Sequence, residues 1–326
     1  MHPFTPAHGL RNAHLQTLLP RFLRRHPLFT PVTQRIDTPD GDFLDLAWTD
    51  APETCAPDQP VMVLFHGLEG SFHSPYANGL LHAAKQQGWL GVMMHFRGCS
   101  GEMNRLPRSY HSGETGDARF FLHWLRQQLP TQPFMAVGVS LGGNMLVNYL
   151  AETQTASDVV AAQVISPPLD LAACSERIQQ GFSQVYQRYL LGSMKRNLDQ
   201  KIAAHPEAMP VDTARAQQIA TLWQFDEHIT APLHGFANAD DYYRRCSGLS
   251  KLHQIITPLR IIHAKDDPFM TEAVIPPQPL PAHIDYHLSE HGGHVGFVTG
   301  HWRKPTFWLE HTVPAWFTQH LQTLYK

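Results

Sequence analysis

Short apolar runs recur along the chain, and apolar residues at helical spacing fill several of the stretches between them. Residues 61–65 read VMVLF, with no polar position, which is typical of a strand buried on both faces of a sheet. Runs of this character occupy residues 61–65, 91–95, 134–139, 161–166, 259–263 and 284–288. Helical patterns occupy residues 78–87, 117–128, 143–153 and 315–324. Strands that alternate with helices predict an α/β fold, with a mostly parallel sheet and helices on both faces.

A pair of shorter strands precedes the first buried run. Residues 32–38 and 43–48 flank Pro39-Asp40-Gly41, a turn sequence between two alternating segments. We expect these two strands to form an antiparallel hairpin at the edge of the sheet, which then has eight strands.

One segment interrupts the alternation of strands and helices. Residues 167–257 contain helical patterns and no convincing strand, although a simple crossover needs only a dozen or so residues plus its helix. The helical patterns lie at residues 175–191, 199–204 and 214–225. We interpret residues 167–257 as a helical cap that packs over one end of the sheet, within a single domain spanning residues 1–326.

Composition narrows the class of protein. The 326 residues carry 25 basic and 28 acidic side chains, so there is no basic excess to indicate nucleic-acid binding. The four cysteines form no CxxC pair, which favours reduced thiols in a cytoplasmic protein. The N-terminus does not resemble a signal peptide, and no run of about 18 apolar residues predicts an integral membrane segment.

The 22 histidines direct attention to a possible metal site. No HExxH motif occurs, and His291 and His294 lie three apart in a glycine-rich loop without a nearby carboxylate or cysteine to complete a ligand set. We therefore expect no metal and no other cofactor. Chelator sensitivity would separate a metal hydrolase from an enzyme that uses serine.

The sharpest chemical motif is GVSLGG at residues 138–143, which follows the strand FMAVGV and precedes a helical pattern. A strand, a GxSxG turn and a helix form a nucleophile elbow, in which a strained backbone presents the serine at the edge of the sheet. Gly138 and Gly142 let the strand and the helix approach closely. The motif predicts Ser140 as the nucleophile and the backbone N–H of Leu141 as an oxyanion donor.

A serine nucleophile needs a base and an orienting acid. In folds that present the serine on such an elbow, these residues follow one another along the chain in the order Ser, Asp, His. Asp266 and Asp267 lie in the loop that follows the strand at 259–263, and we favour Asp267 because it stands immediately before a proline. The glycine-rich loop after the last strand offers His294 as the base, with His291 as the alternative.

The loop after the strand at 61–65 reads HGLEGS. Its glycines allow the backbone to turn beneath a substrate carbonyl, so the N–H of Leu68 is predicted as the second oxyanion donor. We interpret His66 as a residue that braces this loop. Cys99 also follows a strand, but no histidine and acid follow it in the required order, so we interpret it as a small loop residue.

Together, these motifs resemble those of the α/β-hydrolase superfamily and, within it, the AB hydrolase 4 subfamily. The resemblance extends from residues 14–17 to the C-terminal helix. It is carried by HLQT (14–17), HGLEG (66–70), FRGCSG (96–101), GVSLGGN (138–144), FDE (225–227), ADDYY (239–243), DDPF (266–269) and HGGHVGF (291–297). It implies a triad of Ser140, Asp267 and His294, and hydrolysis of carboxylic esters (EC 3.1.1.-).

The expected activity is that of a serine carboxylesterase that acts on small, short- to medium-chain esters in lipid metabolism. The resemblance also leaves open an acyltransferase that moves medium-chain acyl groups to an alcohol, or a lipase or phospholipase. Without a membrane-spanning segment, a bilayer substrate is in doubt. A binding protein that has kept only the fold is a further alternative, which the intact Ser140, Asp267 and His294 disfavour. The sequence does not indicate an oligomeric state.

Overall fold

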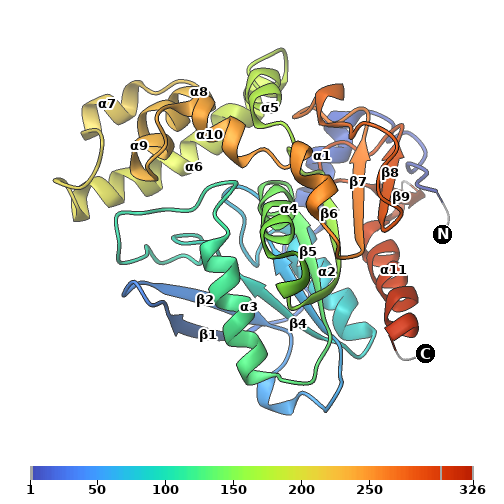
Figure 1. Cartoon of the computed structure of the whole chain (residues 1–326). Helices are drawn as coiled ribbons and strands as arrows, with labels where there is room; N and C mark the ends of the chain where they lie inside the picture. The colour runs from blue at the N-terminus through green and yellow to red at the C-terminus, as the bar shows by residue number, and fades with distance from the viewer. Residues whose placement is uncertain (1–2, 302, 325–326) are drawn as a thin grey trace.

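The computed structural model of the protein describes residues 3–301 and 303–324. An eight-stranded sheet forms its centre (Figure 1), with the strand order β1-β2-β4-β3-β5-β6-β7-β8. The strands are β1 (Val32–Asp37), β2 (Phe43–Trp48), β3 (Val61–Phe65), β4 (Leu90–Met94), β5 (Phe134–Val139), β6 (Val159–Ile165), β7 (Leu259–Ala264) and β8 (Ile284–Ser289). The predicted number of strands is confirmed, and no boundary differs from the prediction by more than two residues.

Strand directions follow the predicted pattern. β1 pairs with β2 and β2 with β4 in antiparallel fashion, whereas every neighbouring pair from β4 to β8 is parallel. The carboxyl ends of six strands therefore meet at one edge of the sheet. In open α/β sheets this is the edge where ligands bind.

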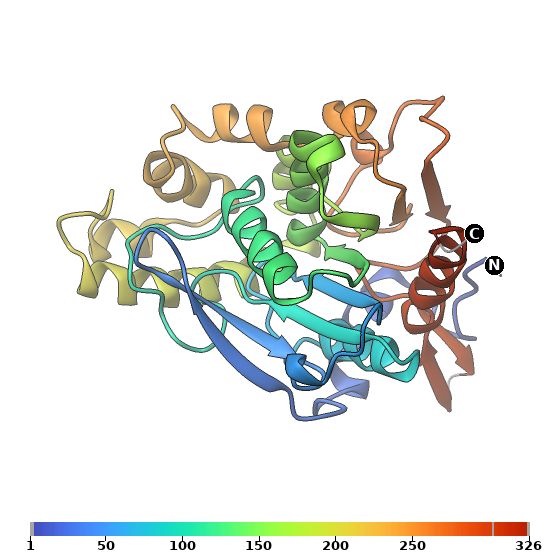
Figure 2. The same ribbon diagram turned by 60° about the horizontal axis from the view of Figure 1, so that its bottom comes forward.

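Helices cover both faces of the sheet (Figure 2). They are α2 (Pro75–Gln86), α3 (Gly116–Gln128), α4 (Leu141–Thr153) and α11 (Leu309–Leu324). Side chains alternate along β3: Val61, Val63 and Phe65 pack into the core beneath α3 and α4, while Met62 and Leu64 join the core beneath α2 and α11. The unbroken apolar run at residues 61–65 predicted that both faces of this strand would be buried.

The segment between β6 and β7, which the structure describes throughout, contains helices and no strand. Its helices are α5 (Leu171–Arg177), α6 (Ser183–Ala204), α7 (Thr213–Gln218), α8 (Leu222–Phe225), a π-helical turn (Asp226–Thr230), α9 (Ala231–Leu233), α10 (Ala239–Cys246) and a 3₁₀ segment (Leu249–Gln254). In Figure 1 the helices from α5 to α10 extend beyond the sheet, above its carboxyl edge, whereas Leu249–Gln254 packs beside α4. We refer to residues 167–257 as the cap.

The predicted helix at 175–191 is wrong in one respect, because the chain breaks between α5 and α6. Gly181 adopts a left-handed conformation with φ 54°, which an α-helix cannot accommodate. After this break α6 continues to Ala204 and absorbs the separate helix predicted at 199–204.

Besides several short helices, two features of the fold were not predicted. One is α1 (Ala13–Leu23), which Asn12 caps by accepting the N–H groups of His14 and Leu15. The other is a small hairpin of β9 (Val298–His301) and β10 (Lys304–Phe307). In the described part of the chain, no helix has the length and apolar character needed to cross a membrane.

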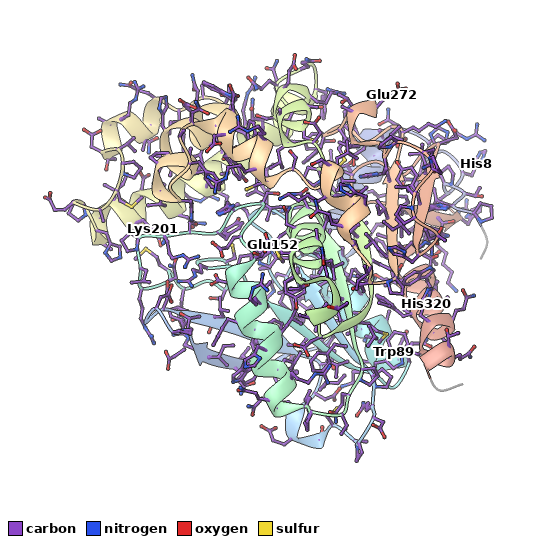
Figure 3. All side chains as sticks on the ribbon, viewed as in Figure 1. His8, Trp89, Glu152, Lys201, Glu272 and His320 are labelled. Atoms are coloured by element: carbon purple, nitrogen blue, oxygen red, sulfur yellow. The ribbon has the colours of Figure 1, made fainter. Side chains whose placement is uncertain are left out.

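A buried lysine joins the cap to the core. Lys201 extends from α6 toward the loop between β4 and α3 (Figure 3). There its ammonium donates to Asn104 Oδ1 at 2.7 Å and to the carbonyls of Leu106 and Arg108. Burial lowers the pKa of this ammonium to about 8. Three oxygen acceptors satisfy its three donors, so this contact fixes the position of α6 relative to the core.

Candidate active site

Ser140 occupies the sharp turn between β5 and α4, with φ 51° and ψ −121°. A side chain on either neighbouring glycine would collide with the backbone. A Cβ on Gly138 would lie 2.6 Å from the carbonyl oxygen of Gly142, and one on Gly142 would lie 2.4 Å from that of His66. The close approach of strand and helix explains why both positions are glycine, and it presents Ser140 at the carboxyl edge of the sheet.

Three side chains from separate loops form a hydrogen-bonded line at this edge. Ser140 Oγ lies 3.0 Å from His294 Nε2, and His294 Nδ1 lies 2.8 Å from Asp267 Oδ2. These are the distances required for a serine that donates to a histidine, which in turn donates to a carboxylate. The structure thus brings together the three residues that the sequence placed after β5, β7 and β8.

Asp267 and His294 are held by the loop that follows β7. Asp267 is almost fully buried, and its second oxygen, Oδ1, accepts the N–H of Phe269 at 2.8 Å. The ring of Phe269 stacks on that of His294 with 4.0 Å between centroids and 5° between planes. Packing and hydrogen bonds therefore restrict both rotation of the imidazole and movement of the carboxylate.

Helix α1 supports the histidine loop from the other side. Thr17 Oγ1 accepts the backbone N–H of His294 at 2.9 Å. The loop approaches α1 so closely that a Cβ on Gly296 would lie 2.0 Å from the carbonyl oxygen of Gln16. Sequence reasoning missed Thr17 as a positioning residue, although it belongs to the HLQT segment that was noted only as part of the resemblance.

The alternative acid and base pair with each other instead. Asp266 Oδ1 accepts the N–H of Gly293 at 2.9 Å, and its Oδ2 lies 3.3 Å from His291 Nδ1. These contacts stabilise the loop, and they direct His291 toward Asp266. Of the two histidines, His294 is the one whose ring reaches Ser140.

The loop after β3 surrounds the opposite side of Ser140. Leu68 and Leu141 line the same cavity as Ser140. The N–H of Leu141 is the first of α4 and has no acceptor inside that helix, and within the described residues no acceptor is assigned to the N–H of Leu68. Both amides are therefore available as donors, and Tyr76 braces the loop by accepting the N–H of Gly67 at 2.8 Å.

His66 and Cys99 have structural environments. His66 Nε2 accepts the N–H of Phe96, its Nδ1 contacts the carbonyl of Gly67 at 2.7 Å, and burial lowers its pKa to about 3. A neutral, doubly hydrogen-bonded ring can brace the loop but is poorly placed to act as a base. Burial also raises the pKa of the Cys99 thiol far above neutral pH, so it lacks the thiolate that a nucleophile needs.

A cavity of about 380 Å³ opens above Ser140 and His294. Its wall is mainly apolar, and the cap contributes a substantial part of it. The apolar side chains include Leu171, Ile178, Leu190, Met194, Leu222, Phe269 and Met270. Asp226 is a polar exception: it accepts hydrogen bonds from Tyr243 and Thr230, and burial raises its pKa to about 6.

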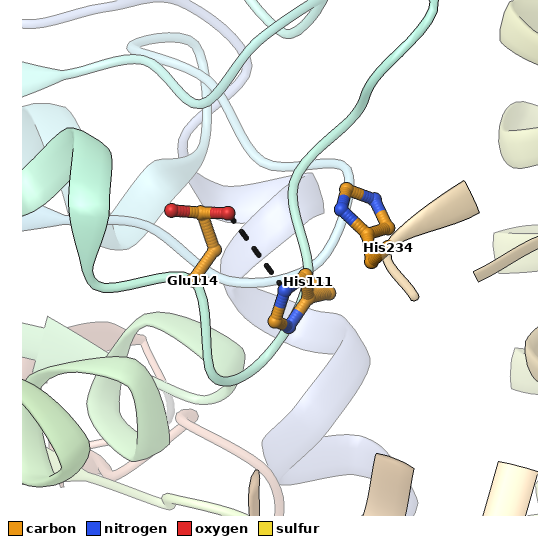
Figure 4. A group of neighbouring side chains, drawn as sticks. All are labelled: His111, Glu114 and His234. Carbon is orange, nitrogen blue, oxygen red and sulfur yellow. Dashed lines mark ion pairs between the residues drawn. The ribbon is translucent and has the colours of Figure 1, made fainter. Parts of the chain in front are cut away.

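A possible metal-binding group, drawn in Figure 4, combines His111 and Glu114 of the core with His234 of the cap. One ligand atom from each of His111, Glu114 and His234 lies within 4.8 Å of the others. Two contacts weaken this group as a site: Glu114 accepts from Arg108 at 2.6 Å, and His111 Nδ1 accepts the N–H of Gly113. In the neutral ring the proton then sits on Nε2, the atom nearest Glu114, where a metal would need a lone pair.

Comparison with known proteins extends the picture to the whole chain. A family model described as "alpha/beta hydrolase fold" matches residues 60–301. The chain is 52% identical over 320 residues to "Putative esterase YheT" of Escherichia coli strain K12, covering 98% of this chain and 94% of that protein. It is 28% identical over 315 residues to human "Phospholipase ABHD3", covering 95% of this chain and 76% of that protein.

A solved structure is similar in fold. The esterase Pf2001 of Pyrococcus furiosus superposes with a TM-score of 0.54, at 14% sequence identity, over 89% of this chain and 90% of that one. At this identity the likeness concerns the fold alone. It agrees with the mostly parallel, helix-flanked sheet described above.

Proposed function

The chain belongs to the α/β-hydrolase family and is an ester hydrolase, and from that premise we propose that it is a serine carboxylesterase of short- to medium-chain esters. The observation that carries the proposal is the hydrogen-bonded line of Ser140, His294 and Asp267 beneath an apolar cavity. A nucleophile, a base and an orienting acid are the groups that acyl transfer through a covalent intermediate requires.

The proposed reaction assigns one role to each side chain. Ser140 Oγ attacks the ester carbonyl while His294 Nε2 takes its proton, and Asp267 accepts the Nδ1–H so that the correct nitrogen is free. The N–H groups of Leu68 and Leu141 stabilise the oxyanion of the tetrahedral intermediate. His294 then protonates the leaving alcohol, and water releases the acid from the acyl-enzyme by the same steps in reverse order.

The cap is proposed to form the acyl site. Leu190 and Met194 of α6 and Leu222 of α8 contribute apolar wall on the cap side of the cavity. An acyl chain that enters this space loses its contact with water. The volume of the cavity then determines which acyl-chain lengths the enzyme accepts.

We expect kcat/KM to rise with acyl length and then fall. Each additional CH₂ buried in the cavity contributes about 0.8 kcal/mol, or about fourfold in kcat/KM. The rise should end when the cavity is full, so long-chain triolein emulsions should be poor substrates. The measurement is kcat/KM for p-nitrophenyl esters with two to sixteen acyl carbons.

A variant that fills the cavity sharpens this test. Met194→Trp should shift the optimum to a shorter chain while leaving acetyl ester hydrolysis similar to that of the wild type. A flat profile, or a preference for emulsified triolein, would contradict the proposed acyl site. Added ethanol provides a second arm, because an excess of ethyl ester over free acid would favour the acyltransferase alternative.

We expect EDTA to leave ester hydrolysis unchanged. In the proposed mechanism Ser140 and His294 supply the nucleophile and the base, and the contacts of His111 and Glu114 disfavour metal binding. The measurement is kcat/KM after dialysis against the chelator. Loss of activity with recovery on adding zinc would contradict the expectation, and loss of that recovery in His234→Ala would identify the metal site.

A further inference from the structure

Helix α1 presents apolar residues to the solvent. The residue it buries completely is polar: the Gln16 side chain donates to the carbonyls of Leu10 and Val298 and accepts the N–H of Val298. Leu15, Leu18 and Phe22 are exposed, and at this spacing they form a stripe along one face of the helix. The usual arrangement of a surface helix, with its apolar side against the core, is thus reversed.

The beginning of α6 extends this stripe. Phe182 and Tyr189 are 50% and 58% exposed, and Val185 between them is also exposed. Arg21 donates to the hydroxyl of Tyr189 at 2.6 Å, which places this part of α6 beside α1. We call the combined surface the entrance face. Its residues are Leu15, Leu18, Phe22, Phe182, Val185 and Tyr189.

The entrance face adjoins the cavity that contains Ser140. Leu18 and Arg21 of α1 and Tyr189 of α6 line that cavity as well as the surface. The exposed apolar side chains therefore lie beside the cavity that an ester must enter. Exposed apolar patches in such positions mark interaction surfaces.

Charge is distributed unevenly in the same two segments. Residues 1–36 contain five arginines and no acidic residue, although Arg24 pairs with Glu310 and Arg35 with Asp45 and Glu102. Residues 177–198 contain four basic residues and no acidic one. The chain as a whole has more acidic than basic side chains, 28 against 25. Arg11, Arg25 and Arg188 are exposed, so the two segments that carry the entrance face also present basic side chains to the solvent.

We propose that the entrance face docks reversibly on an anionic lipid surface. The apolar stripe enters the boundary between headgroups and acyl chains, and the arginines contact the anionic headgroups, as in helices that lie in the plane of a membrane. Docking needs no membrane-spanning segment, so a bilayer can be the source of substrate. That the docked protein takes its ester from this surface rests on the proposed function.

Docking can be tested without catalysis. The Ser140→Ala protein is mixed with vesicles of phosphatidylcholine alone or with phosphatidylglycerol added, and the bound fraction is measured by sedimentation. We expect binding to the anionic vesicles, weakened by salt, and little binding to the neutral ones. Replacing Arg11, Arg25 and Arg188 by glutamine should weaken binding about fivefold for each arginine removed.

Apolar contacts are tested by Phe22→Ser and Val185→Ser, neither of which lines the cavity. Each should reduce the affinity for anionic vesicles, Phe22→Ser by about tenfold or more. Ile256→Ser is the matched control: Ile256 is 48% exposed but lies just before β7, at the opposite edge of the sheet. Ile256→Ser should bind vesicles like the parent protein. When the three substitutions are made in the protein that retains Ser140, each should leave p-nitrophenyl acetate turnover unchanged.

Three outcomes would overturn the proposal. Equal binding to neutral and anionic vesicles would contradict the role of charge, and parent-like binding of Phe22→Ser and Val185→Ser would contradict the role of the apolar stripe. A dimer that Phe22→Ser dissociates, in a protein that binds no vesicles, would assign the entrance face to a second copy of the chain. Since vesicle binding is measured on an inactive variant, failure of the esterase proposal would leave this result interpretable.

Discussion

Ser140→Ala should lower kcat for ester hydrolysis by about a millionfold, the loss typical of removing the nucleophile from such a triad. The serine oxygen is the atom aligned with His294 Nε2 at 3.0 Å, and alanine retains no group that can form an acyl-enzyme. Alanine has the same backbone preferences as serine at the φ of 51°, so the turn should be preserved. The measurement is kcat with a p-nitrophenyl ester of optimal length.

Folding and site specificity need separate controls. The Ser140→Ala protein should unfold at the wild-type temperature, and it should lose reaction with a fluorophosphonate probe that labels the parent protein. Ser157→Ala is a control at a second serine, whose Oγ accepts the N–H of Val159 at the start of β6 and contacts Tyr149. Near-normal turnover by folded Ser140→Ala would rule out the serine mechanism.

Asp267→Asn should lower kcat by about 10⁴, whereas Asp266→Asn should have a far smaller effect. An amide at position 267 can donate to His294 Nδ1, which favours the tautomer with its proton on Nε2 and leaves no base for Ser140. Asp266 contacts only the loop in this region, where it accepts the N–H of Gly293, and an asparagine oxygen can still accept that hydrogen bond.

Asp267→Asn and Asp266→Asn are thus a matched pair, in which the same substitution is made at adjacent positions. Both variants should be measured for kcat and for unfolding temperature, since buried Asp267 also accepts the N–H of Phe269. A folded Asp267→Asn protein that is clearly more active than Asp266→Asn would show that the acid is misassigned. A similar loss in both variants would indicate that loop structure, and not tautomer control, limits the rate.

Much of the fold could be predicted because its signals are local. The apolar run at 61–65 specifies a strand buried on both faces, and Pro39-Asp40-Gly41 specifies the turn between β1 and β2. The elbow at Ser140 is also local, since adjacent residues set its backbone geometry. Strand order constrained the search for the acid and the base, because parallel strands end at the same edge of the sheet.

Contacts between distant segments were harder to predict. The support of His294 by Thr17 joins residues separated by 277 positions, and the approach of His111 to His234 joins the core to the cap. Helix α1 lacks an inward apolar stripe, so hydrophobic periodicity gave no reason to pack it against the core. Its stability depends on Gln16, whose partner Val298 comes from the other end of the chain.

The sequence by itself determined the sheet, the helices that cover it, and a short set of candidates for nucleophile, acid and base. Those features depend on residues that are close in the chain, so composition and spacing are sufficient to specify them. The tertiary structure alone decided which histidine reaches Ser140, which carboxylate contacts that histidine, which cap residues line the cavity, and that exposed apolar side chains of α1 and α6 lie beside it. These depend on side-chain direction and on packing between distant segments, which no local pattern encodes.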